Sequence, residues 1–506
     1  ADLQQSLRFE ISAVGAEKLI EVVAMQDKPY HFRLVKSRNL IDTIEVLGLA
    51  RVHEIQKQAF NVTAIDATKL YNSTLDVAGA LDKVAGVRFR ESGGVGSNFN
   101  LSLNGFSGNH VRYFIDGIPM DNFGSSFQIN NIPINLAERI EVYKGVVPMW
   151  LGSDALGGAV NIVTSDKVRN YVDVSYSYGS FNTHRSVVNA AITTSKGFTF
   201  RINAYQNYSD NNYKVNVDAA DIFTGAYTVN AQVKRFHDTY HNESIIAHVG
   251  LVNKSYADRL LFGFTMGKNY KELQTGARMV SVFGGIHSRG NTLMPTLKYQ
   301  KNDLIQGLDV LLNANYNFGD ERNIDTVNAR FDWYGNQKPT GSAGERTRQV
   351  YKYKNREGLA NLSVNYRLAE QHALALNNVF TTFNRSGKDL LNPANDRLEI
   401  PQKSHKNVLG LGYSYDLKDR WSATVFGKYI VQYNGDIQAA GISTGRLGYG
   451  LASSYYVNPN WQLKTSYELT NRVPTAFELY GDVENQEANA NLKPERSHNV
   501  NRGTQY

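Results

Sequence analysis

Apolar and polar positions alternate strictly in many segments of the chain after Ser165. In the segment from Phe198 to Ala204 apolar residues occupy every second position, and the segment from Trp461 to Leu469 repeats the pattern. Alternation over about 9–11 residues is typical of a strand with one lipid-facing side and one wet side. Four further segments behave in the same way: Val172 to Tyr178, Leu308 to Tyr316, Ala360 to Leu368 and Leu409 to Tyr415.

The lengths of the connections distinguish between two all-β classes. We predict about fourteen strands after Ser165, and their connections alternate between short and long. An outer-membrane barrel has short periplasmic turns and long external loops, whereas a soluble sandwich has no such parity. The pattern therefore predicts a membrane all-β barrel. The short connections are 195–197, 253–258, 301–306, 369–371, 416–419 and 458–460, and the long ones lie near 210–234, 270–291, 319–347, 385–404, 432–446 and 471–495.

The amino-acid composition excludes several classes of function. The 506 residues include no Cys, 30 Tyr and 42 Gly, with 54 Lys+Arg against 47 Asp+Glu. The absence of Cys excludes a disulfide scaffold, thiol catalysis and Cys-ligated metals. The net charge of +7 is spread without a Lys/Arg-dense block, so nucleic acid is not an expected partner. Apolar runs stay shorter than about 18 residues, which excludes membrane-spanning helices.

Motifs of catalysis and metal binding are incomplete. The glycines of Gly93 to Gly96 lack the Lys-Ser/Thr that a phosphate loop requires. His237 and His241 lack a third ligand, which favours plain polar lining over a metal site. No serine sits in a nucleophile elbow. We therefore expect no enzyme, no catalytic residue, no metal site and no permanently bound cofactor.

The region before Ser165 has a different texture, with glycines clustered between short apolar runs. Repeated glycines allow sharp turns and close packing, so a compact α/β unit is predicted, with a helical stretch from Thr74 to Val84. Its charged residues Arg139, Glu141 and Lys144 are available to pair with charges on the barrel wall. The unit contains the motifs Leu101 to Met120, Ala137 to Gly145 and Leu151 to Thr164.

These motifs resemble the plug of TonB-dependent outer-membrane receptors. The family's usual Ile-Asp-Gly-Val-Pro is matched by Ile115 to Pro119, and its Glu-Arg-Ile-Glu-Val by Glu138 to Val142. Asn104-Gly105 replaces the family's Arg-Gly. Farther along, Asn471 to Gly481 and Asn489 to Glu495 resemble the family's paired barrel motifs.

The resemblance implies an N-terminal α/β plug inside the lumen of a barrel. A barrel wide enough to hold such a plug needs about 22 antiparallel strands, so the wall is expected to be truncated at the C-terminus of this sequence. We assign residues 49–165 to the plug and 166–506 to the barrel, with the boundary at Ser165/Asp166. Residues 1–40 look like the remnant of a carboxypeptidase-regulatory-like β-sandwich, which often precedes such receptors in Bacteroidetes; a generic hydrophilic leader is the alternative.

Residues 41–48 occupy the place of the family's energy-coupling segment, the TonB box. A short β-prone segment can add a strand to the sheet of a partner protein, and the partner implied here is TonB with its inner-membrane energising complex. The alternative is that the segment forms the first strand of the plug itself. The coupling residues would be Asp42, Thr43, Ile44, Glu45 and Val46.

Family membership implies uptake of a scarce small-molecule chelate across the outer membrane of a Gram-negative bacterium. Glycan importers usually carry Lys-Asp-Ala-Ser before the plug's Tyr-Gly-Ser, whereas this chain has Lys144-Gly145-Val146-Val147, the pattern of the iron-chelate branch. Haem receptors usually place a His between the two barrel motifs, and none lies between Pro474 and Asn489. His110 is interpreted as a packed or capping residue. A ferric siderophore is therefore favoured, with haem or cobalamin uptake, or a ligand-sensing receptor or adhesin without net import, as alternatives.

The ligand is expected on outward-facing plug loops that combine aromatic faces with amide groups. An alternative for Phe123 and Phe127 is that they merely pack the plug against the barrel. External arginines are compatible with capture of an anionic chelate, and contacts with outer-membrane lipid and lipopolysaccharide would explain the same charges. The candidate ligand-binding residues are Asn98, Phe99, Asn100, Asn122, Phe123, Phe127 and Gln128.

Overall fold

The structure is a computed structural model that divides into two compact units, Ala1–Asp42 and Thr43–Tyr506. In the first unit, β1 (Ser6–Ile11) pairs antiparallel with β2 (Leu19–Ala24). The predicted sandwich remnant stays a prediction, and the predicted coupling residues 42–46 lie outside the described residues. The structure describes residues 6–11, 19–24, 32, 55, 57–71, 73–152, 154–164, 170–276, 278–394, 401–417, 420–435, 442–481, 487–489 and 491–505.

Fourteen antiparallel strands form one continuous sheet in which each strand pairs with the next along the chain, except where a hairpin intervenes. This confirms the predicted membrane all-β wall. Its strands are β11 (Tyr171–Gly179), β12 (Thr183–Thr193), β13 (Phe198–Ser209), β16 (Tyr240–Lys254), β17 (Ala257–Glu272), β18 (His287–Lys301), β19 (Leu308–Asp325), β22 (Gln349–Ala369), β23 (His372–Asp389), β24 (Gln402–Leu417), β25 (Trp421–Gly435), β26 (Ile442–Asn458), β27 (Trp461–Arg472) and β28 (Glu495–Gln505).

The connections of this sheet have the predicted parity. Short turns join β12 to β13, β16 to β17 and β22 to β23, and all of these lie on one side of the sheet. The connections on the other side are mostly long. They contain the hairpin of β14 (Lys214–Ala220) and β15 (Tyr227–Lys234), the hairpin of β20 (Ala329–Phe331) and β21 (Gln337–Pro339), and the helix α3 (Ala476–Tyr480). We call the two sides the short-turn side and the long-loop side.

Alternation along the strands separates an outward face from an inward face. On β11, Val172 and Val174 expose 74% and 66% of their surface, and on β24 Leu411 exposes 58%. On β13, by contrast, the interleaved Thr199 and Arg201 are buried. Apolar side chains thus cover the outward face, as expected of a sheet that faces lipid. None of the helices in the described ranges is long and apolar enough to span a membrane.

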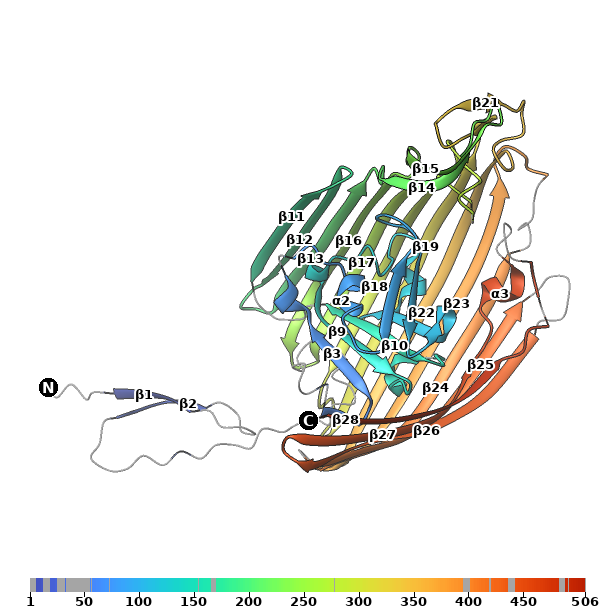
Figure 1. Ribbon diagram of the computed structural model, residues 1–506. Helices are drawn as coiled ribbons and strands as arrows, with labels where there is room; N and C mark the ends of the chain where they lie inside the picture. The colour runs from blue at the N-terminus through green and yellow to red at the C-terminus, as the bar shows by residue number, and fades with distance from the viewer. Residues whose placement is uncertain are drawn as a thin grey trace. The chain divides into compact units, whose positions relative to one another are not determined.

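The plug consists of a five-stranded sheet in the order β3-β9-β10-β7-β8 and a three-stranded sheet β4-β5-β6. Figure 1 shows these elements on the concave side of the fourteen-stranded sheet. Of the predicted helical stretch from Thr74 to Val84, only α2 (Val77–Leu81) is helical; the Asp76 side chain caps it by accepting from Gly79 N at 2.8 Å. The plug strands are β3 (Val62–Asp66), β4 (Val87–Glu91), β5 (Phe99–Leu103), β6 (Phe106–Ser107), β7 (Val111–Ile115), β8 (Ile118–Pro119), β9 (Ala137–Lys144) and β10 (Gly158–Thr164).

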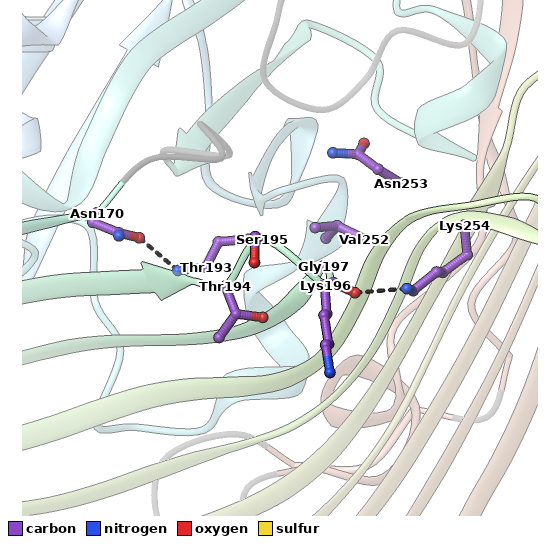
Figure 2. Close-up of a pocket in the computed structure, with 9 residues that line it drawn as sticks. All are labelled: Asn170, Thr193, Thr194, Ser195, Lys196, Gly197, Val252, Asn253 and Lys254. Atoms are coloured by element: carbon purple, nitrogen blue, oxygen red, sulfur yellow. Dashed lines mark hydrogen bonds between the residues drawn. The ribbon is translucent and has the colours of Figure 1, made fainter.

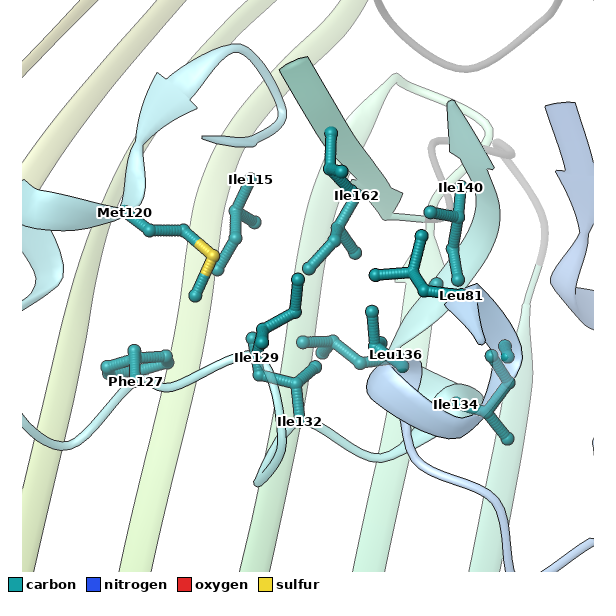
Figure 3. Close-up of a cluster of buried hydrophobic side chains, with 14 of the residues drawn as sticks. Leu81, Ile115, Met120, Phe127, Ile129, Ile132, Ile134, Leu136, Ile140 and Ile162 are labelled. Atoms are coloured by element: carbon teal, nitrogen blue, oxygen red, sulfur yellow. The ribbon is translucent and has the colours of Figure 1, made fainter. Parts of the chain in front are cut away.

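Short 3-10 turns join these strands: η1 (Ala67–Leu70), η2 (Gly108–His110), η3 (Met120–Phe123), η4 (Ile134–Leu136) and η5 (Met149–Leu151). The core of the plug gathers aliphatic side chains from both ends of the domain, among them Leu81, Ile132 and Ile162 (Figure 3). The same cluster continues into the wall through Val187, Tyr205, Ile246 and Met294. Plug and wall therefore share one apolar core along β12 to β18. Residues 165–169, which contain the predicted plug–barrel boundary, lie outside the described residues.

Candidate functional site

A cavity of about 300 Å³ opens on the long-loop side, where a plug loop meets the ends of β17 to β22. The plug contributes Asn98, whose Oδ1 accepts a hydrogen bond from Lys271 Nζ at 3.1 Å. The long connection before β22 contributes Arg346, which lies 5.9 Å from the ring centroid of Phe283. The lining also includes His287, Thr347 and Gln349. Two cations, the carboxylate of Asp325, which accepts backbone N–H bonds from residues 345–347, and several amide and hydroxyl groups thus line a space next to the plug.

The glycine-rich loop before Asn98 packs directly on the wall. A Cβ on Gly94 would lie 2.2 Å from Asn211 Oδ1, and a Cβ on Gly96 would lie 2.2 Å from the Tyr240 ring. Asn211 also binds both backbone groups of Val95, accepting from its N at 3.0 Å and donating to its O at 2.9 Å. The glycines therefore permit close approach to the barrel.

The first group of predicted ligand residues lies on this loop and the strand after it. Asn98 and Asn100 are exposed. Phe99 is half-buried, stacks on Phe89 with ring centroids 5.4 Å apart and meets the edge of Tyr113 at 6.2 Å. The structure brings Asn98 to the cavity, and contact of these residues with a ligand stays a prediction.

The second predicted group lies deeper. Phe123 and Phe127 are each only 3% exposed, with their ring centroids 5.3 Å apart, and Phe127 meets Tyr205 of β13 edge-on at 6.1 Å. Asn122 is also buried, and Gln128 is half-buried. The two phenylalanines thus make the packing contact that the alternative interpretation describes, whereas a role in ligand contact is still a prediction.

Sequence reasoning did not identify an ionic cluster that joins the plug to the paired barrel motifs. Arg472 donates to Glu478 at 2.8 and 3.1 Å and to Glu495 at 2.6 and 2.9 Å. From the plug, Asn109 donates to Glu478 at 3.2 Å, and His110 Nε2 lies 2.8 Å from Glu495 Oε2. The charged residues of the two motifs were the available signal. His110 is therefore a contact residue between plug and wall.

Glu478 belongs to α3, in a loop outside the membrane-spanning strands. Burial would raise its pKa, but hydrogen bonds from Arg472 and from the Thr475 backbone outweigh burial and lower the pKa to about 2. Its carboxylate also completes a capping box with Thr475 at the start of α3. The cluster thus orders the helix and its contact with the plug together.

Three further ion pairs connect plug and wall in the described parts of the chain. Arg185 of β12 lies 3.6 Å from Asp76 of the plug. Asp154 receives hydrogen bonds from Arg112 within the plug at 3.2 Å and from Lys406 of β24 at 3.1 Å. Burial would raise the pKa of Asp154, but its attraction to Arg112 and Lys406 holds that pKa well below its usual range. Asp116 lies 2.9 Å from Lys298 Nζ of β18, and both side chains are largely buried.

The prediction that Arg139 and Glu141 pair with the wall is wrong. The two side chains lie on the same face of β9, two residues apart, and bind each other at 2.7 Å inside the plug. Glu141 also accepts from Tyr143 and Asn161, at 3.0 and 2.9 Å. A strand places residues i and i+2 on one side, so Arg139 and Glu141 pair with each other along β9, an interior strand of the plug sheet.

The two histidines considered for metal binding do not meet. His237 is buried in the loop before β16, with Nε2 2.8 Å from the Ile286 carbonyl oxygen. Burial lowers the pKa of His237 despite the nearby Glu272. His241 lies on β16 and is 3.3 Å from Glu243.

A second cavity, of about 410 Å³, lies on the short-turn side (Figure 2). The turns β12–β13 and β16–β17 form it together with Asn170, whose Oδ1 accepts from Thr193 N at 2.6 Å. Lys254 Nζ donates to the Lys196 carbonyl at 2.6 Å. These bonds tie the ends of neighbouring strands together, on the side opposite the cavity at Asn98.

A plug carried on the inner face of a membrane sheet defines an outer-membrane receptor, and comparison with known proteins agrees. The family model for the TonB-dependent receptor plug domain matches residues 54–159, and the model for the TonB-dependent receptor-like β-barrel matches residues 251–506. The chain belongs to the family of TonB-dependent receptors. This is a family of transporters and receptors rather than of enzymes, and its barrels lie in the outer membrane of Gram-negative bacteria.

Individual relatives agree with the fold. The vitamin B12 transporter BtuB of Vibrio vulnificus is 36% identical over 93 residues, which is 18% of this chain and 15% of that protein. The chain thus matches far less than two thirds of that relative's length. The FrpB iron transporter from Neisseria meningitidis is 15% identical with a TM-score of 0.64, covering 88% of this chain and 70% of its own. The siderophore receptor PiuA from Acinetobacter baumannii is 12% identical with a TM-score of 0.61 and the same coverage.

Proposed function

We propose that this chain is the plug and much of the wall of a TonB-dependent transporter that takes up a small anionic chelate, a ferric siderophore in the first place. The observation that carries the proposal is the cavity at Asn98. It lies on the long-loop side, at the plug, and its lining carries two cations, Lys271 and Arg346, against one carboxylate, Asp325. A cleft lined by cations attracts anionic ligands, and ferric chelates are often anionic.

Capture and transport are separate steps in this proposal. The chelate binds at the cavity, and TonB, with its inner-membrane energising complex, pulls on the segment that contains Asp42 to Val46. The FrpB and PiuA structures, which are named for iron and siderophore, support an iron chelate as cargo. Cobalamin is the second candidate, because a vitamin B12 transporter is 36% identical to this chain over 93 residues.

Binding of a panel of ferric siderophores, haem and cobalamin to the full-length receptor tests the choice of ligand. For an anionic ferric chelate, Lys271→Gln with Arg346→Gln should weaken binding about tenfold or more, since each variant removes a hydrogen-bonding charge. The matched control is Arg330→Gln, an exposed arginine on β20 outside the cavity. Equal binding by the double variant and the wild type would contradict the assigned cavity.

Deletion of Asp42 to Val46 tests the coupling step. We expect uptake of the bound chelate by cells to cease while binding at the cell surface stays at the wild-type level. Uptake at the wild-type rate would show that the segment belongs to the plug and that coupling lies elsewhere.

A further inference from the structure

Three of the long connections are joined to one another on the long-loop side. The first carries the β14–β15 hairpin, the second joins β17 to β18 and the third joins β19 to β22; they are residues 210–239, 273–286 and 326–348. Trp333 of the third connection packs in one apolar cluster with Val217 and Val233 of the hairpin. Its Nε1 donates to the carbonyl oxygen of Met279, in the second connection, at 2.7 Å. We call these three connections the three-loop cap.

One carboxylate holds the second and third connections together. Glu345 Oε1 accepts a hydrogen bond from Gly284 N at 2.8 Å. Its Oε2 accepts from Gly285 N at 2.7 Å and from Ile286 N at 2.9 Å. Hydrogen bonds to an ionised acceptor are about twice as strong as neutral ones. A single side chain of the third connection thus fixes three consecutive residues of the second.

Two glycines allow this close approach. A Cβ on Gly285 would lie 2.2 Å from Val327 Cγ2, and a Cβ on Gly284 would lie 2.6 Å from the Phe331 ring. Both distances are too short for real atoms, so any larger residue would push the second connection away from the third. The backbone amides therefore reach Glu345 only because the glycines have no side chain.

A second carboxylate fastens Glu345 to the wall. Asp325 is the last residue of β19 and is 3% exposed. Its Oδ1 accepts from Glu345 N at 2.8 Å, and its Oδ2 accepts from Arg346 N at 2.8 Å and from Thr347 N at 2.9 Å. Two carboxylates in series thus connect the end of a wall strand to the third connection, and the third connection to the second.

The residues held in this way form the walls of the cavity at Asn98. Ile286 lines the cavity from the second connection, whereas Arg346 and Thr347 line it from the third and directly follow Glu345. The Arg346 guanidinium also lies 5.9 Å from the ring centroid of Phe283, across the joint between the two connections. The position of each wall therefore depends on the hydrogen bonds of Glu345.

We propose that Glu345 is a positioning residue that fixes both walls of the cavity, so that the three-loop cap is assembled before a chelate arrives. The identity of the ligand rests on the proposed function, whereas the assembly of the loops does not. A preformed site avoids the entropic cost of ordering loops on binding. The cavity of about 300 Å³ is at the lower end of the range for ligand pockets. Fixed walls of this size favour a compact anionic chelate over a broad ring such as haem.

Distances between the loops test the assembly without any ligand. The 506 residues contain no Cys, so Val280→Cys and Ser342→Cys, at exposed positions of the second and third connections, accept spin labels selectively in a full-length receptor without other cysteines. Double electron–electron resonance should give one narrow distance distribution. Glu345→Gln should broaden it, because the amide places a donor opposite backbone N–H groups. Gly285→Ala should broaden it too, without a change in charge.

Two matched controls should leave the distribution narrow. Asp221→Asn also alters a carboxylate that accepts two backbone hydrogens, from Phe223 N at 2.9 Å and Thr224 N at 2.7 Å, but both lie in its own turn. Gly276→Ala adds a methyl group to the second connection at a position where the nearest atom, Ser281 Cβ, is 3.4 Å away. A wild-type distribution as broad as that of the Glu345 and Gly285 variants, or a narrow distribution in both variants, would overturn the proposal.

Binding of ferric citrate, a compact anionic chelate, provides the second readout. Removal of a carboxylate near the cavity would strengthen anion capture if charge alone mattered. The positioning role has the opposite sign: Glu345→Gln should raise the Kd about tenfold, while Asp221→Asn, which removes the same charge, should stay within about twofold of the wild type. Equal or tighter binding by Glu345→Gln, or a shift of the wild-type distance distribution on addition of ferric citrate, would overturn the proposal. If the wild type binds no ferric citrate, the proposed function fails for this chelate, and the distance distributions still decide whether Glu345 holds the loops.

Discussion

The plug meets the barrel wall through two kinds of contact on two different sides. Along β12, β13 and β16 most contacts are neutral: the wall residues Asn189, Asn207 and Asn242 each donate a side-chain amide hydrogen to a plug carbonyl at 2.8 Å. One ion pair lies on this side as well, between Arg185 of β12 and Asp76 of the plug at 3.6 Å. Along β18, β24 and β28 charged groups join the neutral contacts: Lys298 meets Asp116, Lys406 meets Asp154, and Glu495, itself paired with Arg472 of β27, meets His110 of the plug. We call these the amide side and the ionic side.

The difference shows how one interface can contain contacts that are stable over a range of conditions and contacts that respond to pH and salt. Amide-to-carbonyl hydrogen bonds do not titrate and depend little on salt, whereas ion pairs respond to pH and, where solvent reaches them, to ionic strength. The amide side also includes the shared apolar core around Tyr205. We therefore expect acid to loosen the ion pairs between plug and wall first, while the amide-to-carbonyl hydrogen bonds of the amide side persist.

The largest effect should come from removing aromatic packing on the amide side. Phe123→Ala with Phe127→Ala should lower the free energy of unfolding by about 5 kcal/mol or more, since truncating one buried Phe costs about 3–5 kcal/mol. Denaturant unfolding of the full-length receptor measures this, with Phe223→Ala, 61% exposed in the β14–β15 connection, as the control. Loss of chelate binding at unchanged stability would instead identify these residues as part of the ligand site.

A single charge change on the ionic side should come next. Asp116→Asn keeps a residue that tolerates the positive φ of 51° at this turn but leaves Lys298 buried without its carboxylate. Breaking a buried pair from one side costs about 3–5 kcal/mol. The denaturation midpoint should recover in large part when Lys298→Met is added. If the double variant is no more stable than Asp116→Asn alone, the pair is not what the substitution disrupts.

The dependence on pH separates the two sides directly. The pKa of Glu478 is about 2 in the folded protein against 4.5 for an unperturbed glutamate. Its interactions therefore stabilise the protein fully above about pH 4.5 and are lost as the pH falls towards 2, a change of at most about 3 kcal/mol, because solvent screens this part-exposed carboxylate. Unfolding measured across this range should show the loss in the wild type and a flatter profile in Glu478→Gln. If the stability of both proteins falls equally with pH, Glu478 does not contribute to the loss of stability in acid.

The smallest effect is expected for one neutral contact. Asn207→Ala removes the donor to the Asn131 carbonyl and should cost about 1–3 kcal/mol, with the same value at pH 7 and pH 4. Asn216→Ala, at an exposed position of β14, is the matched control and should change stability by less than about 0.5 kcal/mol. Pronounced acid sensitivity of the Asn207 effect would contradict the division into two sides.

The wall was predictable from sequence because alternation and loop parity are local signals. Each strand pairs with a near neighbour, so the pattern within and between segments such as Phe198 to Ala204 reflects the final sheet. The helical stretch from Thr74 to Val84 was predicted too long, since only one turn around α2 is helical and the next strand begins at Val87.

The contacts between plug and wall could not be predicted from the sequence. Asn109 and Glu478 are 369 residues apart in the chain, and no local pattern relates them. Arg139 and Glu141 looked like exposed charges because their strand also carries polar residues. That strand, β9, lies in the interior of the plug sheet between β3 and β10, and the two side chains bind each other. The predicted ligand residues fall into an exposed and a buried group, which the sequence did not indicate. Asn98 is exposed and Phe127 is buried because of where the surrounding wall lies, and the wall is distant in sequence.

The separation in sequence between the partners of the ionic cluster has a consequence for the order of folding. From β11 to β28, each strand of the sheet pairs with the next strand of the sheet along the chain, through a turn or a longer loop. Local contacts of this kind form early in folding. The Arg472 cluster closes only when the plug, synthesised first, meets a segment made hundreds of residues later. Loop closure over such a distance is entropically costly. Docking of His110 and Asn109 onto Glu495 and Glu478 should therefore be a late kinetic step, and the receptor should pass through a state in which the wall is paired and the plug is not yet fastened.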